Sequence, residues 1–255
     1  MPGCIYLHPA AMKTSSNLNE SSISRSTRNN AIYLLPRRFY LIQLILLTVT
    51  GLAFTWISRN EVWDFALTRM WFDPVSQQFP WKENVWLDLI NHRLAKDTVI
   101  AVAVIALLTG AIRRNGRLVL VALLTGVGPL VVGILKATSA HSCPWDLIEF
   151  GGKAVSWPLF SALPLDSGPG RCFPGGHASS GFGVMALFFW FYPQRPRLAW
   201  LCFLAGALLG MLMGYGQMMR GAHFLSHNLW AGWWVWLSQC FTFGCVSYLL
   251  NKTRK

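Results

Sequence analysis

Apolar residues fall into six long blocks separated by polar or charged segments. The blocks cover residues 39–58, 98–112, 118–135, 179–192, 198–214 and 229–250. A helix needs roughly 20 residues to cross a hydrocarbon core of about 30 Å. The first, third and last blocks meet this requirement best, whereas the second and fourth need extensions from about Leu94 and from His177. The pattern predicts an all-α, polytopic membrane protein with about six transmembrane helices within residues 39–250.

Composition agrees with this class. Hydrophobic residues make up 53% of the chain and charged residues only 13%, and 13 residues are tryptophan. Soluble domains carry about 25% charged residues. Four of the tryptophans lie among alternating charges in residues 59–97. Indole rings favour the membrane interface, so we expect one or two interfacial helices in this segment.

The net charge of +12 is concentrated on one side of the predicted bundle. With the N-terminus inside, the inner segments hold thirteen of the 22 basic residues and one of the ten acidic residues, and the remaining nine of each lie outside. This positive-inside pattern sets both termini in the cytoplasm. It predicts a bacterial inner (cytoplasmic) membrane protein whose segments 59–97, 136–178 and 215–227 face the periplasm. The distribution makes a nucleic-acid partner unnecessary.

The two ends of the chain are polar. Residues 1–38 are rich in Ser, Asn and Arg without an apolar period, which is typical of a disordered cytoplasmic tail. Residues 251–255 form a second, short cytoplasmic tail.

Groups suited to binding a phosphate occur in two of the outer segments. Lys136 and Arg220 can bind a phosphate as a point charge and as a planar fork. Gly175 and Gly176 precede an apolar helix, where successive backbone N–H groups and the helix dipole favour an anion. If the chain crosses the membrane twice between these segments, the four residues meet on one face.

Histidines in the same segments add nucleophilic and acid–base chemistry. His177 follows the glycines, and His223 and His227 lie four positions apart near the last apolar block. One histidine can attack phosphorus to give a phosphohistidine while another protonates the leaving oxygen. This chemistry requires no metal ion or other cofactor.

The order of these residues resembles the phosphatidic acid phosphatase type 2 superfamily, which includes membrane lipid phosphatases, soluble acid phosphatases and vanadium haloperoxidases. Its membrane members have six helices and the motifs Lys-x6-Arg-Pro, Pro-Ser-Gly-His and Ser-Arg-x5-His-x3-Asp. Lys136 and Pro144 match the first motif, and Pro174, Gly176 and His177 match the second. The third motif is matched best when His223 takes the position of the nucleophile.

The resemblance implies roles for the histidines and a class of substrate. His223 would be the nucleophile, His177 the general acid and His227 a partner that contacts His223 or the phosphate. The reaction would hydrolyse or transfer a phosphate or diphosphate monoester of a membrane lipid. Substrates of this class include undecaprenyl diphosphate, phosphatidylglycerophosphate, phosphatidic acid and the phosphates of lipid A.

The chain departs from the family motifs at several positions. Cys143, Gly175, Gln217 and His227 replace the expected arginine, serine, arginine and aspartate, and Arg220 lies three residues after the expected arginine. A nucleophilic histidine needs a partner that fixes its tautomer. Because no Asp or Glu follows Asp166, the candidate partners are His227, Asn228, Asp146 and Glu149.

Two of the six cysteines lie in predicted outer loops. An oxidising compartment permits a disulfide between Cys143 and Cys172. Closing a loop of about 30 residues would contribute roughly 3 to 4 kcal/mol. Two buried free thiols are the alternative. The other four are Cys4 in the tail and Cys202, Cys240 and Cys245 in predicted membrane helices.

Two other functions compete with a lipid phosphatase. The motif departures fit a catalytically weak or inactive protein that binds or transports lipid phosphates. A metalloenzyme could use His141, His177, His223 and His227, but a recognisable metal-ligand spacing is absent. Phosphate release from a panel of lipid phosphates in the presence of a chelator would separate the three hypotheses.

Overall fold

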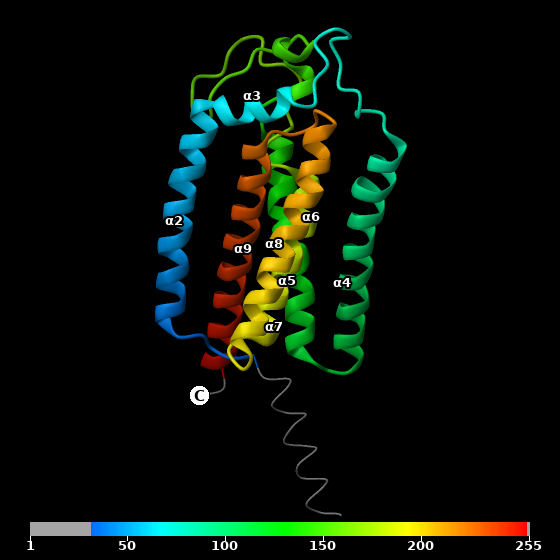
Figure 1. Cartoon of the computed structure of the whole chain (residues 1–255). Helices are drawn as coiled ribbons and strands as arrows, with labels where there is room; N and C mark the ends of the chain where they lie inside the picture. The colour runs from blue at the N-terminus through cyan, green and yellow to red at the C-terminus, as the bar shows by residue number, and fades with distance from the viewer. Residues whose placement is uncertain (1–31, 254–255) are drawn as a thin grey trace, which may run out of the picture.

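A computed structural model describes residues 32–253, and most of the predicted 1–38 tail and residues 254–255 lie outside these residues. The described chain is a bundle of long, roughly parallel helices, and a short helix and several loops cover one end (Figure 1). The elements are α2 (Arg37–Asn60), α3 (Val62–Arg69), the π-helix η1 (Leu87–Leu94), α4 (Ala95–Ile112), α5 (Gly116–Thr138), the 3-10 turns η2 (Pro144–Asp146) and η3 (Ile148–Phe150), α6 (Gly176–Gly183), the 3-10 turn η4 (Val184–Ala186), α7 (Leu187–Phe191), α8 (Pro196–Met219) and α9 (Leu225–Lys252).

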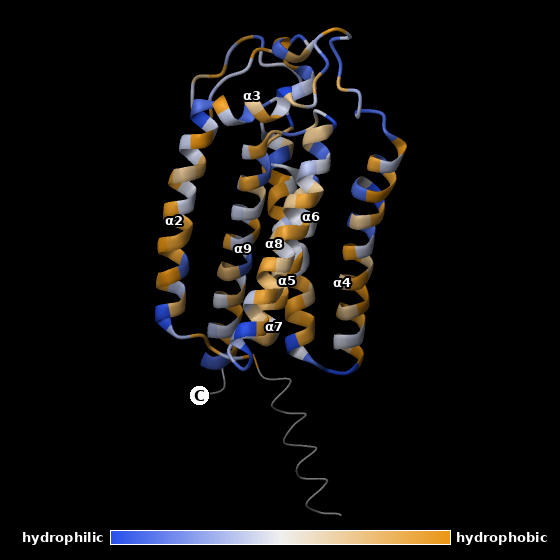
Figure 2. Cartoon of the chain, viewed as in Figure 1, coloured by the Kyte–Doolittle hydropathy of each residue, from blue (hydrophilic) through white to orange (hydrophobic). Residues whose placement is uncertain are grey.

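Four helices in the described part of the chain are long and apolar enough to cross a bilayer. They are α2, the continuous helix Leu87–Ile112, α5 and α8, and Figure 2 shows the hydrophobic residues along their ribbons in orange. They indicate a multi-pass membrane protein. The other two predicted spans correspond to α6–α7, which a 3-10 turn interrupts, and to α9, which has 28 residues but carries buried polar side chains such as Gln239. A total of six crossings therefore stays a prediction.

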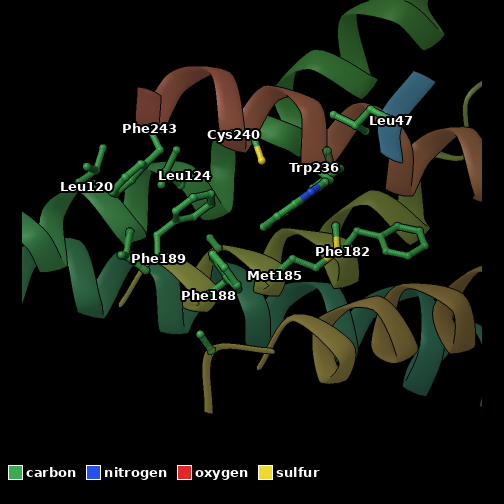
Figure 3. Packing of buried hydrophobic residues seen from close by; sticks show 14 of the residues in the cluster. Leu47, Leu120, Leu124, Phe182, Met185, Phe188, Phe189, Trp236, Cys240 and Phe243 are labelled. Carbon is green, nitrogen blue, oxygen red and sulfur yellow. The ribbon is translucent and has the colours of Figure 1, made fainter. Parts of the chain in front are cut away.

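The bundle core lies between α5, α6–α7, α8 and α9. Phe182, Phe188, Phe189, Trp236 and Phe243 fill it (Figure 3). The ring centroids of Phe189 and Phe243 lie 4.5 Å apart in a stacked arrangement, and such aromatic pairs add about 0.5 to 1.5 kcal/mol to simple burial. By contrast, α4 is peripheral. Only 6% of the apolar stretch of the helix Leu87–Ile112 is buried inside the protein, compared with 33% of the apolar stretch of α5.

Small residues let α6 approach its neighbours closely. A Cβ on Gly181 would lie 2.7 Å from the backbone of Gly210 in α8, so only glycine fits there. Close backbone approach at small residues is a common way of packing membrane helices. The amide of Gln239 joins the same elements, since its Nε2 donates to the carbonyl oxygens of Leu124 (3.3 Å) and Gly183 (2.9 Å).

Two predicted outer segments are more helical than the sequence pattern indicates. In the 215–227 segment, α8 continues to Met219 and α9 begins at Leu225, so the connection is only five residues long. In the 59–97 segment, α3 fits the predicted interfacial helix, but the helix that contains α4 already begins at Leu87. Its polar residues have partners that the pattern could not reveal, such as the 2.8 Å ion pair between Arg93 and Asp88.

Candidate active site

The candidate residues gather at the end of the bundle that α3 covers (Figure 1). Lys136 lies in the last turn of α5, Gly176 and His177 begin α6, and His223 lies in the connection from α8 to α9. His227 lies in the first turn of α9 rather than in an outer loop. The last turn of one helix and the first turns of two others thus meet at this end of the bundle.

Lys136 lies across the first turn of α6. A Cβ built on Gly176 would be 3.3 Å from Cδ and 3.5 Å from Nζ of Lys136. The ammonium group therefore lies beside the helix N-terminus, where unpaired N–H groups also favour negative charge. The two features together favour an anion at this point.

His223 is buried, and one of its two ring nitrogens has defined neighbours. The Nδ1 atom of His223 is 3.5 Å from Nδ1 of His227 and 3.5 Å from Sγ of Cys172. Burial, and then electrostatic repulsion by His227, Lys136 and His177 when the ring is protonated, hold the pKa of His223 well below its usual value. The imidazole is therefore neutral at physiological pH, and its Nε2 is the ring nitrogen left for chemistry.

Gly175 connects the second motif to the third. Its N–H donates to the carbonyl oxygen of His227 at 2.8 Å. A Cβ at this position would lie 2.6 Å from Oδ1 of Asn228, whose side chain is fully buried. The close approach explains why glycine stands where the family has serine. The predicted phosphate-binding N–H of Gly175 is thus used to hold α9 against the start of α6.

A disulfide joins Cys143 to Cys172, whose Cα atoms are 5.1 Å apart. It links the loop after α5 to the segment before α6, and Cys172 is fully buried beside His223. The N–H of Cys143 donates to Oδ2 of Asp146 at 3.3 Å. Burial raises the pKa of Asp146. This predicted orienter therefore closes the turn that carries Cys143, while the ring of His223 has His227 and Cys172 as its neighbours.

Arg220 caps the C-terminus of α8 and points toward the segment before η1. Its Nε donates to the carbonyl oxygen of Lys82 at 3.0 Å, and its NH1 lies 3.4 Å from Oδ1 of Asp88. The predicted phosphate ligand thus holds the loop before η1 against α8.

Asp64 is a buried carboxylate that the sequence reasoning missed. It lies in α3, is only 3% exposed, and accepts a hydrogen bond of 2.9 Å from the N–H of Ser226. Burial raises the pKa of Asp64 to about 6. Because Phe224 at the N-cap position has no side-chain acceptor, Asp64 supplies the cap of α9 from another helix. The signal for this carboxylate was the start of α9 after Phe224, which offers no side chain that could cap the helix.

A small polar cavity of about 30 Å³ adjoins His227. Glu61, Asp64, His141 and Ser156 contribute to its walls together with His227. The volume is enough for a water molecule with several polar partners. His141 stacks on Trp157 at 3.8 Å between ring centroids, and burial lowers the pKa of His141 to about 4. Glu61 and Asp64 therefore line the same cavity as His227, the candidate partner of His223.

The predicted four-histidine metal set does not form one cluster. Among the described residues, the group whose donor atoms come close enough for one ion contains Cys172, His223 and His227, all within 4.8 Å of one another. His141 and His177 are not members of this group. In the structure the sulfur of Cys172 is bonded to Cys143, so it offers no thiolate to a metal.

A protein-family comparison matches residues 117–251, more than half of the chain, to the model described as PAP2 superfamily. The chain belongs to the PAP2 superfamily. Membership implies an activity of the phosphatase or phosphotransferase type, with phosphate esters as substrates. No curated protein and no solved structure matches the chain.

The PAP2 match covers α5 to α9 and excludes α2, α3 and α4. Lys136, His177, His223 and His227 all lie inside it. Asp64 and Glu61 lie outside, so the carboxylates nearest to the start of α9 come from a part of the chain that the family motifs do not describe.

Proposed function

We propose that the protein is a metal-independent lipid phosphatase or phosphotransferase that acts through a phosphohistidine on His223. The observation that carries the proposal is the environment of this ring. Its Nδ1 faces His227 at 3.5 Å, and Lys136 and His177 are close enough to lower its pKa. A neutral imidazole between a tautomer-fixing partner and a cationic phosphate site is suited to attack on phosphorus.

In the first step, Nε2 of His223 attacks phosphorus and the bond from phosphorus to the leaving oxygen breaks. The N–H of Nδ1 is then donated to Nδ1 of His227, which stabilises the imidazolium that develops. His177 gives a proton to the leaving oxygen, so a neutral alcohol or a protonated phosphate departs. The charge on the phosphoryl oxygens is balanced by Lys136 and by N–H groups at the start of α6.

In the second step, water or another acceptor alcohol attacks the phosphohistidine. His177 now accepts a proton from the attacking oxygen, and the bond between phosphorus and Nε2 breaks. Water gives inorganic phosphate, whereas an alcohol gives a new phosphate ester. Both reactions return His223 to its neutral form.

Apolar grooves beside the site support a lipid as the substrate. A cavity of about 570 Å³ lies between α4 and α5 and reaches Ser180, one turn beyond His177 in α6. A second cavity of about 360 Å³ lies between α2, α8 and α9. An acyl or prenyl chain in either groove would remain in hydrocarbon while its phosphate met Lys136. Undecaprenyl diphosphate, phosphatidylglycerophosphate, phosphatidic acid and lipid A phosphates all fit this description.

The proposal places the protein in a bacterial inner membrane with the site toward the periplasm. The excess of basic residues at the ends of the helices opposite α3 supports this orientation. A disulfide beside the site is also consistent with an oxidising compartment.

A catalytically weak protein that binds lipid phosphates is the second candidate. It is favoured by the contacts of Arg220. Its guanidinium binds the carboxylate of Asp88 and the backbone carbonyl oxygen of Lys82 rather than pointing to the histidines. Cys143 in place of a motif arginine removes another cation from the phosphate site.

The deciding experiment measures phosphate release from lipid phosphates by the purified protein in detergent with EDTA. We expect release from at least one lipid, no release by His223→Ala, and normal release by Tyr248→Phe, a change at an exposed position near the C-terminal end of α9. Release by His223→Ala would contradict the assigned nucleophile. Lipid binding without release by the unmodified protein would select the second candidate.

A further inference from the structure

The sulfur of Cys172 and the Nδ1 atoms of His223 and His227 form a compact triangle of donor atoms. Two of its sides, from Nδ1 of His223 to Sγ of Cys172 and to Nδ1 of His227, are both 3.5 Å. Each of the three residues offers a donor atom within 4.8 Å of those of the other two. Cys143 is bonded to Cys172, so a second sulfur adjoins the triangle. The exposed fractions of Cys172, His223 and His227 are 0%, 2% and 4%, so the donors are held by the surrounding core.

We propose that reduction of the Cys143–Cys172 disulfide creates a tetrahedral zinc site from the two thiolates and the Nδ1 atoms of His223 and His227. Zinc bound at about 2.3 Å from sulfur and about 2.0 to 2.1 Å from nitrogen has ligand atoms about 3.3 to 3.8 Å apart at the edges of its tetrahedron. The two 3.5 Å sides already have this length. Cys143, whose sulfur is bonded to that of Cys172 in the oxidised protein, would supply the fourth ligand.

The types of donor select the ion. Two thiolates and two imidazoles are the ligand set of structural zinc sites and bind soft or borderline ions, whereas magnesium and calcium prefer oxygen. The carboxylates of Asp64 and Glu61 lie at the cavity that adjoins His227 and are not members of the donor group. A site of this composition is closed, with no position left for water or substrate.

Reduction of the disulfide requires a two-electron reductant, and a dithiol supplies both the electrons and the protons. A dithiol donates two electrons and two protons to the Cys143–Cys172 bond and becomes a disulfide, and each cysteine becomes a thiol. Each thiol then loses its proton as zinc binds. The protein thus exchanges a covalent link between two loops for a metal link between the same loops and α9.

Zinc at this site would stop attack by His223, and this consequence rests on the function proposed above. Catalysis requires a proton on Nδ1 of His223 and a free electron pair on Nε2. Zinc takes the electron pair of Nδ1, so the neutral ring must carry its proton on Nε2. The nucleophilic nitrogen then has no electron pair for phosphorus. The site therefore acts as a switch in which a reducing dithiol and zinc together turn the enzyme off.

Metal binding is tested without substrate. The purified protein is kept oxidised or reduced with a phosphine, desalted without oxygen, and titrated with Co²⁺, which reports thiolate ligands by charge-transfer absorption and tetrahedral geometry by its visible bands. We expect about one Co²⁺ per reduced chain, displaced by Zn²⁺, and no such bands in the oxidised chain. Cys172→Ser should abolish the thiolate bands. Cys245→Ser removes an exposed free cysteine and should leave them unchanged.

His227→Ala keeps the disulfide and tests the site by another route. Loss of an imidazole ligand should weaken binding of Co²⁺ to the reduced chain by more than about tenfold, since loss of even an outer hydrogen-bond partner costs about 10- to 100-fold. Bands of equal strength in the reduced protein and in Cys172→Ser, or equal affinity in His227→Ala, would overturn the proposal.

Phosphate release is measured separately on the same samples. Zinc should inhibit the reduced protein, a chelator should reverse that inhibition, and the oxidised protein should be insensitive. If Co²⁺ binds as expected but no form of the protein releases phosphate, the proposed enzyme fails and the metal site stands. If phosphate is released but reduction creates no binding, the metal site fails alone.

Discussion

The Nδ1 atoms of His223 and His227 lie 3.5 Å apart although only His227 belongs to α9. The spacing of four residues brings the rings together, but the extended Phe224 between them turns the first ring back toward the helix start. Both imidazoles are almost fully buried, and a hydrogen bond between them needs a proton on one Nδ1 and a free electron pair on the other. In the motif correspondence proposed from the sequence, this pair takes the place of the family's histidine and aspartate.

A neutral acceptor stabilises the developing imidazolium less than a carboxylate does. We expect His227→Ala to lower kcat by about 10- to 100-fold with little effect on KM, because the loss is felt as charge develops on His223. His227→Asp should retain more activity than His227→Ala. Phosphate-release kinetics at several substrate concentrations measure both. Activity of His227→Ala equal to that of the unmodified protein would remove His227 from the mechanism.

Asp64 should make stability depend on pH between about 4 and 6. Its folded pKa of about 6 lies above the ordinary value of 3.8, so its contribution is fully present below the unfolded pKa and is lost as pH rises through 6. The shift corresponds to about 3 kcal/mol. Asp64→Asn can still accept from Ser226 but does not titrate.

The measurement is thermal unfolding in detergent from pH 4 to pH 8. Asp64→Asn should gain stability relative to the unmodified protein as pH rises, and should match it near pH 4. Asp97→Asn, at a side chain that is 66% exposed, serves as the control and should follow the unmodified curve. A constant difference across this range would show that Asp64 is ionised at pH 4 or never ionised.

Gly175 should not tolerate a side chain. Gly175→Ala brings a methyl group to 2.6 Å from Oδ1 of Asn228 and 3.2 Å from the carbonyl of His227. We expect a loss of about 1 to 3 kcal/mol in the free energy of unfolding and a fall in activity, because α9 moves away from α6. Gly133→Ala in α5 is the matched control, since its new Cβ would meet nothing within 4 Å. Equal melting temperatures of the two variants would contradict the proposed packing.

Removing the disulfide should destabilise the site end of the bundle. The bridge spans 29 residues, and the chain-entropy relation gives about 3 to 4 kcal/mol for a loop of this length. Cys143→Ala combined with Cys172→Ala should therefore lower the denaturant midpoint measured by intrinsic tryptophan fluorescence. Equal midpoints would mean that packing alone holds the loops.

The orientation can be read from cysteine labelling in spheroplasts. Val75 and Leu165 are fully exposed at the α3 end, so Val75→Cys and Leu165→Cys should react with an impermeant reagent. Arg114→Cys, in the turn between α4 and α5, should react only after lysis. A cysteine at position 226 would not serve as a probe of orientation, because Ser226 is buried and the reagent could not reach it. Reaction of Arg114→Cys in intact spheroplasts would reverse the proposed topology.

The apolar blocks predicted the helical class because membrane burial follows composition. Boundaries at the outer end were harder to predict, since polar residues such as Asn91 and Gln217 lie in predicted outer segments although the structure places both in long helices of the bundle. The number of crossings also depends on α9, whose core-facing polar groups weaken its apolar signal. These positions depend on tertiary partners, which a one-dimensional pattern does not contain.

The order of the motifs indicated that Lys136, His177 and His223 share one site, because topology brings their segments to one end of the bundle. The buried carboxylate that caps the start of α9 could not be found in the same way. Asp64 is separated from Ser226 by 162 positions and lies in a tryptophan-rich segment without a motif. Only the packing of α3 over the start of α9 reveals it.

The bridge between Cys143 and Cys172 also makes residues 143–172 a closed ring of covalent bonds. The exposed stretch near Leu163 and Leu165 lies within that ring. A protease that cuts there would divide the chain into a piece with Lys136 and a piece with His177, His223 and His227. The sulfur bond would still hold the two pieces together, so the nicked molecule would behave as a split protein whose halves separate only under reducing conditions.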